Sequence, residues 1–245
     1  MDINEQLRSA AESGDVDQVE GLLLNPKCAP SATDQRGQTA LMRATRNGHR
    51  SCVELLLPVS EPLSKDRYGW TALMIAASNG HSSCVNLLLP VSDPLAKDGG
   101  GLTALIHAAD GHEACLQLLL PVSESLGKDN EGWTALMYAA RGGYELCLQL
   151  LLPISDPLAR DDTGMTALMF AANWGARSCV QLLLPVSDVL AMRRDGHTAS
   201  KMASGRGHFQ VEESIDAYVL AQRERLVLNS IIPAGSPQKR SSLRV

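Results

Sequence analysis

The strongest constraint on this chain is a glycine-led segment that recurs at a nearly constant interval. Successive copies start 31 or 32 residues apart. They open at Gly37, Gly69, Gly101, Gly132, Gly164 and, in altered form, Gly196. A fixed period in this range indicates a repeat architecture, in which each unit packs only against its neighbours.

The copy at 69–90 predicts two short antiparallel helices and a loop. Thr71 stands just before apolar residues at helical spacing, so its hydroxyl is expected to cap the first helix. Gly80 can adopt a positive φ and ends that helix. A second helix follows and stops at Pro90, which lacks the N–H that a helix interior needs, and an extended loop covers 90–98. Helices this short are unstable alone, so neighbouring units must bury each other's apolar faces.

Residues 66–81 read Asp-Arg-Tyr-Gly-Trp-Thr-Ala-Leu-Met-Ile-Ala-Ala-Ser-Asn-Gly-His. This segment resembles the ankyrin-repeat family, with alanine in place of the family's usual proline and methionine in place of its usual histidine. The Leu-Leu-Leu-Pro endings look like an expanded, protozoan-type ankyrin family. The resemblance extends over about residues 4–220. It implies an all-α repeat fold, an ankyrin-type solenoid of about seven stacked helix-turn-helix units joined by extended, β-hairpin-like turns.

Differences between the units divide the chain into four parts. Residues 1–36 are expected to form a degenerate N-terminal capping repeat, 37–195 five full repeats, 196–228 a C-terminal capping repeat with an extended helix, and 229–245 a disordered tail. Terminal repeats need polar outer faces because no neighbour covers them. The third unit has one residue fewer before Gly111, so its first helix should end early. In the tail, phosphorylation of serines and capture of the C-terminal carboxylate by a partner domain are alternatives to a plain solvated segment.

Charge and composition exclude several classes of protein. A net charge of −5 without clustered Lys and Arg argues against nucleic acid as a partner. No apolar run approaches the ~20 residues that span a bilayer, and the first residues lack the apolar core of a signal peptide. We therefore expect a monomeric cytoplasmic protein without membrane insertion, with association with the cytoskeleton as an option. Five of the six cysteines occupy one position of the repeat and are expected to be small buried residues, not disulfides or zinc ligands.

No arrangement of residues in the sequence predicts catalysis. Four histidines belong to a repeated Gly-His step, and the resemblance implies that they support the loops by hydrogen bonding; they are His49, His81, His112 and His208. The aspartates before each turn glycine are expected to bond nearby backbone amides. The sequence contains neither a phosphate-binding loop nor a nucleophile-elbow motif. We expect no catalytic residues, no cofactor and no metal site, and a protein that is not an enzyme.

Positions where the units differ are the ones expected to recognise a partner, because the shared residues build the stack. The resemblance implies that these positions line the turn tips and a concave groove. Six of the nine aromatic residues fall in them, and exposed Trp and Tyr commonly anchor interfaces. The candidate partner-binding residues are Tyr68, Trp70, Ile75, His107, Trp133, Tyr138, Phe170, Trp174, Arg43 and Arg46.

Each candidate also has an interpretation that needs no partner. Trp70 and Trp133 could cover turn backbone, and Tyr138 and Phe170 could pack against the next unit. His107 could be a solvated groove histidine instead of a contact residue.

The sequence favours a non-enzymatic protein-protein interaction scaffold that binds a protein partner through the concave groove and turn tips. One alternative is a regulatory or accessory subunit of an enzyme, for example a kinase, carried on another chain. A true enzyme or small-ligand receptor is the third, and it would need a deep closed pocket, which a short solenoid rarely offers.

Overall fold

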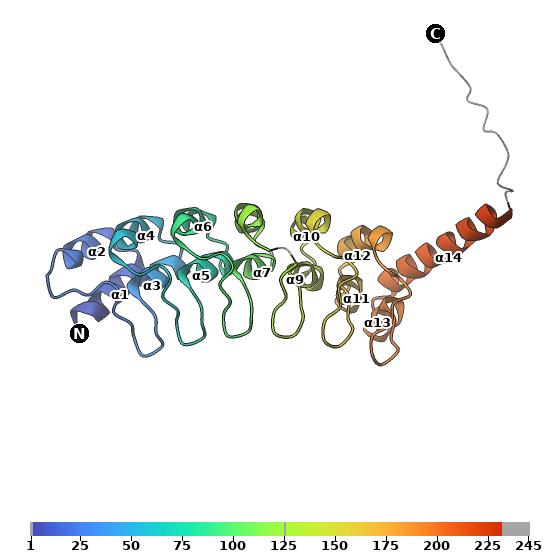
Figure 1. The fold of residues 1–245 in the computed structure, drawn as a ribbon, viewed down its shortest axis with the longest axis horizontal. Coiled ribbons are helices and arrows are strands. Elements are labelled where there is room, and N and C mark those ends of the chain that lie inside the picture. Colours follow the sequence, from blue (N-terminus) through green and yellow to red (C-terminus); the bar gives the residue numbers. More distant parts are fainter. Residues whose placement is uncertain (1, 125, 232–245) are drawn as a thin grey trace, which may run out of the picture.

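The computed structural model describes residues 2–124 and 126–231, with side chains up to Leu228. Within this part, 14 α-helices form seven antiparallel pairs that stand side by side in a row (Figure 1). The first helices of the pairs are α1 (Ile3–Ser13), α3 (Ala40–Arg46), α5 (Ala72–Ser78), α7 (Ala104–Ala108), α9 (Ala135–Gly142), α11 (Ala167–Asn173) and α13 (Ala199–Gly205). The second helices are α2 (Val16–Leu23), α4 (Arg50–Leu56), α6 (Ser82–Leu88), α8 (Glu113–Leu119), α10 (Glu145–Leu151), α12 (Arg177–Leu183) and α14 (Phe209–Ile231).

The predicted all-helical repeat fold is confirmed. The described residues contain no named strand, and the turns carry one isolated β-bridge, between Lys128 and Thr134. No helix among these residues combines the length and apolar character needed to cross a membrane.

A repeated threonine caps the first helix of six pairs, as the sequence predicted. The hydroxyl oxygen accepts a hydrogen bond from the amide three residues further on, at 3.2–3.4 Å, in Thr39, Thr71, Thr103, Thr134, Thr166 and Thr198. Such a cap stabilises a helix by about 1 kcal/mol. Gly80 follows the end of α5 with a φ of +73°, also as predicted. Helix α7 has five residues where α5 has seven, which confirms the early end expected for the third unit.

The second helices that precede a proline end two residues before it, which confirms that proline does not continue the α-helix, but the extended loop does not begin at the proline as predicted. Five of them pass into a short 3-10 turn that contains the proline: η1 (Leu57–Val59), η2 (Leu89–Val91), η3 (Leu120–Val122), η4 (Leu152–Ile154) and η5 (Leu184–Val186). A proline at the start of such a turn is tolerated because its missing N–H removes no interior helical bond. In the unit that opens at Gly69, the extended segment therefore begins at Ser92 and not at Pro90.

A continuous line of buried apolar side chains runs along the row, from Leu7 in α1 to Ile215 in α14. The first helices contribute Leu and Ala, and the second helices contribute Leu, Val and Cys. The five repeated cysteines, Cys52, Cys84, Cys115, Cys147 and Cys179, are fully buried and free, as predicted. Burial raises the pKa of the Cys115 thiol to about 11, so this side chain packs as a neutral hydrophobe.

Successive turns are joined by one backbone hydrogen bond each. The amide of Gly99 donates to the carbonyl of Tyr68 at 2.8 Å. The equivalent donors in the other turns, at 2.9–3.3 Å, are Arg67, Asn130, Asp162 and Arg194. We call these five donors the junction amides, because each one links a unit to its neighbour.

The histidine of the Gly-His step forms a second link between units. Nε2 of His81 lies 2.9 Å from the carbonyl oxygen of Arg46, and the His81 ring covers Gly48. A Cβ on Gly48 would lie only 2.6 Å from Nδ1 of that ring, so the step needs glycine. The equivalent bonds of His49 and His112 measure 3.0 and 2.8 Å, which supports the loop-bracing role that the resemblance implies.

The C-terminal part of α14 extends away from the row, beyond α12 and α13 (Figure 1). It continues to Ile231, past the boundary at 228 that the sequence suggested. The remainder of the expected tail, 232–245, lies outside the described residues.

Candidate functional site

Each turn is held by one aspartate, which fixes the side chains at the turn tip. Oδ1 of Asp66 accepts hydrogen bonds from the amides of Tyr68 and Trp70, at 2.9 and 3.0 Å. Asp98, Asp129 and Asp161 hold their turns in the same way, which confirms that these carboxylates bond backbone amides.

Three predicted residues meet in a hollow between the turns and the C-terminal ends of α3 and α5. This Trp70 hollow measures about 450 Å³ and is lined by Arg36, Gln38, Arg46, Asp66, Tyr68, Trp70, Ser78 and Asn79. Tyr68 is exposed at its rim, whereas Trp70 is half-buried. Arg46 donates to the side-chain oxygen of Gln38, which holds the guanidinium at the wall of the hollow.

A second group, the Trp133 cluster, joins three predicted aromatic residues and one arginine. The ring of Trp133 lies 4.3 Å from that of Phe170 and 5.2 Å from that of Tyr138, centroid to centroid. The guanidinium of Arg141 stands 5.4 Å from the Trp133 ring and 5.3 Å from the Tyr138 ring, at cation–π distance. Arg141 was not among the predicted site residues, although it lies in the last turn of α9 at a position where the units differ.

Three predicted contact residues are buried, so the expectation that they face the groove surface is wrong. Ile75, Phe170 and His107 are 0 %, 3 % and 8 % exposed. His107 and Phe170 each lie against a tryptophan of the preceding unit. The Trp70 ring lies 4.3 Å from that of His107, and Phe170 contacts Trp133 of the preceding unit. Phe170 is therefore packed, but against the preceding unit and not against the next unit named in the alternative interpretation.

The same position, nine residues after the turn aspartate, often carries a hydrogen-bond donor to that aspartate. Nε2 of His107 lies 3.0 Å from Oδ2 of Asp98, so His107 is not the solvated groove histidine that was considered. The hydroxyl of Tyr138 donates to Oδ2 of Asp129 at 2.7 Å. These side chains therefore brace the turns from below.

Arg43 makes the equivalent bond in its own unit. Its guanidinium lies 2.9 Å from Oδ2 of Asp34, and it also meets Glu12 at 2.8 Å and Glu5 at 3.6 Å. Burial by itself would raise the pKa of Asp34, but bonds from Arg43 and from turn amides outweigh it and hold that pKa below its ordinary value. Arg43 thus joins the first pair to the second. Trp174, by contrast, is exposed at the end of α11 and makes no ring contact among the described residues.

We expect His107 to make stability depend on pH. Burial lowers the pKa of its imidazole, and the bond to Asp98 offsets this only in part. The unfolded chain then binds the proton more readily than the native state, so the free energy of unfolding falls as the pH drops below about 6.5. His107→Tyr copies Tyr138 of the next unit, which bonds its aspartate without titrating in this range. Urea denaturation should show that the free energy of unfolding falls less between pH 7 and pH 5 in the variant than in the wild type. An equal fall in both proteins would contradict this prediction.

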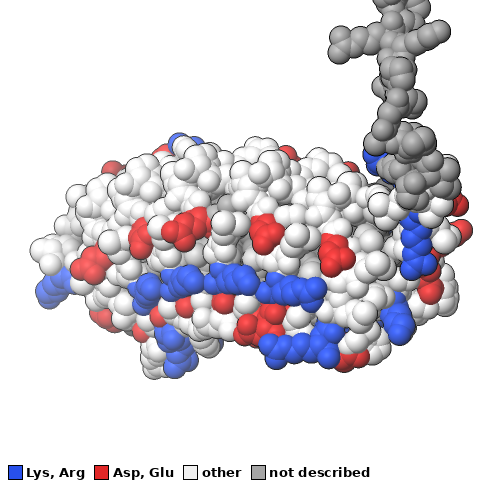
Figure 2. Space-filling view, turned by 45° about the vertical axis from the view of Figure 1, so that its right-hand side comes forward, with Lys and Arg blue, Asp and Glu red and all other residues white. Residues whose placement is uncertain are grey.

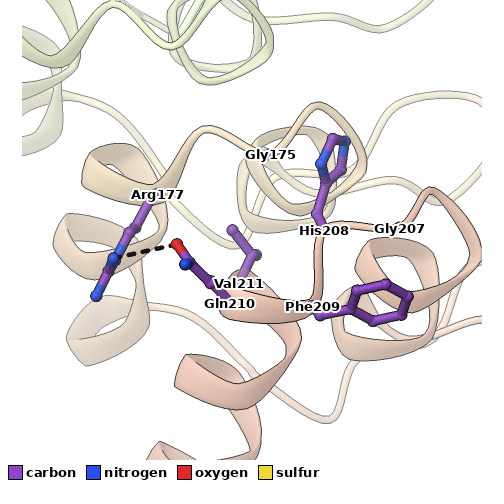
Figure 3. Close-up of a pocket in the computed structure, with 7 residues that line it drawn as sticks. All are labelled: Gly175, Arg177, Gly207, His208, Phe209, Gln210 and Val211. Atoms are coloured by element: carbon purple, nitrogen blue, oxygen red, sulfur yellow. Dashed lines mark hydrogen bonds between the residues drawn. The ribbon is translucent and has the colours of Figure 1, made fainter.

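A further hollow of about 350 Å³ lies at the seam between α12 and the start of α14 (Figure 3). Its residues are Gly175, Arg177, Gly207, His208, Phe209, Gln210 and Val211. Arg177 donates to the side-chain oxygen of Gln210 at 3.4 Å. The His208 ring covers Gly175 as His81 covers Gly48, so this hollow belongs to the stacking pattern. Among the described residues, no group of three His, Cys, Asp or Glu is placed to hold a metal ion.

Comparison with known proteins supports the same architecture. A family model described as ankyrin repeats (3 copies) matches residues 7–98, 91–161 and 143–214. The ankyrin repeat domain of human ASB11 is similar in structure, with a TM-score of 0.79 at 21% identity over 86% of this chain and 96% of that one. The ankyrin repeat domain of Bcl-3, described as a unique member of the IkappaB protein family, gives a TM-score of 0.69 at 25% identity over 84% and 96%. No curated protein matches the sequence.

Proposed function

Since the chain belongs to the ankyrin-repeat family, whose repeats are in general protein-interaction modules, we propose that it is a non-enzymatic scaffold that binds a protein partner through its groove and turn tips. The observation that carries this proposal is that Trp70 shares a hollow with Arg36 and Arg46, while Trp133 lies at cation–π distance from Arg141. Both tryptophans stand on turns held by an aspartate. Trp, Tyr and Arg are the side chains that most often dominate binding energy. We further propose a cytoplasmic location and a partner that is neither nucleic acid nor membrane.

Rigid turns are the mechanism by which this surface would bind. The Asp66 carboxylate and a junction amide fix the backbone beside Trp70, so few side chains have to be ordered when a partner arrives. This lowers the entropic cost of association. Tyr68, Trp70, Arg46, Trp133, Tyr138 and Arg141 are proposed as direct contacts, and the buried residues beneath them as support.

The test is the double variant Trp70→Ala with Trp133→Ala. We expect binding of the main captured partner to weaken on the order of 1000-fold, because two hot-spot truncations at roughly 2 kcal/mol each cost about 4 kcal/mol together. The partner is captured from cell extract on the wild-type chain, purified, and titrated calorimetrically against both chains.

Phe209→Ala serves as the matched control, because Phe209 is an exposed aromatic residue outside both groups. It should bind like the wild type, and circular dichroism should show equal helicity in all three chains. Unchanged binding by the double variant would refute the groove assignment. A single dominant enzyme among the captured proteins would indicate an accessory subunit instead.

A further inference from the structure

The segment that follows each 3-10 turn exposes alternate side chains. Along 59–65, exposed and partly buried residues alternate strictly, and the same pattern recurs in the later units. The first exposed position lies at the end of each 3-10 turn and carries Val59, Val91, Val122, Ile154 and Val186. The next three exposed positions form three further rows. The acidic row is Glu61, Asp93, Glu124, Asp156 and Asp188. The leucine row is Leu63, Leu95, Leu126, Leu158 and Leu190. The basic row is Lys65, Lys97, Lys128 and Arg160. Together they are called the striped face.

The leucine row has no role in the core. Its members are 44–64 % exposed, whereas the leucines of the first helices, such as Leu73 and Leu136, are at most 1 % exposed. Single exposed apolar residues are ordinary on a protein surface, but these five leucines recur at one repeat position and form a regular apolar strip along the row. Such strips mark interaction sites.

The basic row is ordered along the length of the molecule. Lys65 Nζ donates to the carbonyl of Lys97 at 2.9 Å, and Lys97 and Lys128 each donate to the carbonyl of the next unit at 2.9 and 2.8 Å. Arg160 continues the row by donating to Met192 at 2.7 Å. Figure 2 shows a blue row of Lys and Arg side chains with a line of red acidic patches beside it. The bond to a carbonyl takes one of the three N–H groups of each lysine, so the ammonium groups still carry donors for a partner.

The order of the rows makes the striped face complementary to itself. Along each segment the leucine stands between the acid and the base, two residues from either. Consider a second copy placed face to face with the first by a half-turn about an axis parallel to the leucine row. The acidic row of each molecule then lies opposite the basic row of the other, and the two leucine rows meet. A half-turn about an axis perpendicular to the rows would make the two molecules antiparallel and place like charges opposite each other. Only the first arrangement, in which the two molecules run parallel, is therefore favoured.

We propose that two copies of this chain associate in parallel through their striped faces. The unit spacing of roughly 10 Å, set by packed helices, is the same in both copies, so every rung of charge and leucine can pair in register. An unrelated protein surface has no reason to share that period. The interface is isologous, as expected for a twofold dimer. It replaces the monomer expected from the sequence.

This dimer goes beyond the proposed scaffold role. The three rows include none of the residues of the Trp70 hollow or the Trp133 cluster, so a dimer presents two copies of the partner site. Two linked sites bind a multivalent partner more tightly than one.

Charge reversal tests the proposal by sedimentation equilibrium. The base-reversed chain carries Lys97→Glu with Lys128→Glu, and the acid-reversed chain carries Asp93→Lys with Glu124→Lys. The wild type should sediment at twice the chain mass. Each reversed chain alone should dissociate at least tenfold more readily, because like charges then face each other. An equal mixture of the two reversed chains should again give twice the chain mass, because one face is then acidic and the other basic.

Two controls make the result specific. The acid-reversed chain keeps every bond from lysine to carbonyl, so its dissociation cannot come from loss of those links. A chain with Arg50→Glu and Lys201→Glu has the same charge change as the base-reversed chain at exposed sites outside the rows, and should remain a dimer. Circular dichroism checks folding in each chain. A wild type at single-chain mass up to about 100 µM would overturn the proposal, since association would then be weaker than roughly −5.5 kcal/mol. A dimer that both reversals leave intact, or a mixture that does not reassociate, would also overturn it.

Discussion

Replacing Gly80 by alanine is expected to lower the free energy of unfolding by about 3 kcal/mol, whereas the same change at Gly143 should cost about half as much. Both glycines have a φ of +73°, where an added Cβ costs roughly 1–2 kcal/mol. At Gly80 the new Cβ would also lie 2.6 Å from Nδ1 of His112. At Gly143 the neighbour is Ala176, whose Cβ would be 3.5 Å away, an ordinary contact.

Urea denaturation of the two variants measures this difference directly, because the backbone strain is common to both. Gly207→Ala extends the series: its φ is +79°, and nothing lies within 4 Å of the added Cβ. In a chain that already carries His112→Ala, Gly80→Ala should cost only the backbone strain of roughly 1–2 kcal/mol, because no ring then lies against the new Cβ. Equal losses at Gly80 and Gly143 would show that the histidine ring moves aside and does not fix the step as glycine.

Leu136→Ala should lower the free energy of unfolding by about 2–5 kcal/mol, the usual range for a fully buried leucine. Leu136 lies in α9, near the middle of the row, and is 1 % exposed. Because each unit contacts only its neighbours, weakening a central unit also weakens the coupling between the two ends. We therefore expect a broader thermal transition, or two transitions, followed by circular dichroism or calorimetry.

Leu220→Ala is the control for this change, since Leu220 is exposed on α14 and should alter stability by no more than about 0.5 kcal/mol. If Leu136→Ala lowered the midpoint while the transition stayed as sharp as in the wild type, the row would unfold as one unit, and the nearest-neighbour description would be wrong.

Features that depend on local sequence could be predicted well. The glycine period gave the repeat, the threonine before each apolar run gave the helix start, and the missing residue before Gly111 gave the short α7. Each of these follows from contacts within a few residues, so a single unit contains the information.

Features that depend on the neighbouring unit could not be predicted. The residue nine positions after each turn aspartate was expected to line the groove, but Ile75 and Phe170 are buried, and Phe170 packs against Trp133 of the preceding unit. His107 is buried for the same reason, under the ring of Trp70. The rows of the striped face were present as alternating residues in the loop, but their alignment appears only when the units are stacked.

The junction amides have a practical consequence for measuring motion. Each of Arg67, Gly99, Asn130, Asp162 and Arg194 loses its hydrogen-bond partner only when two adjoining turns separate. Their rates of hydrogen–deuterium exchange therefore report separately on the opening of five junctions between units, even though the sequences on either side of each junction are nearly alike.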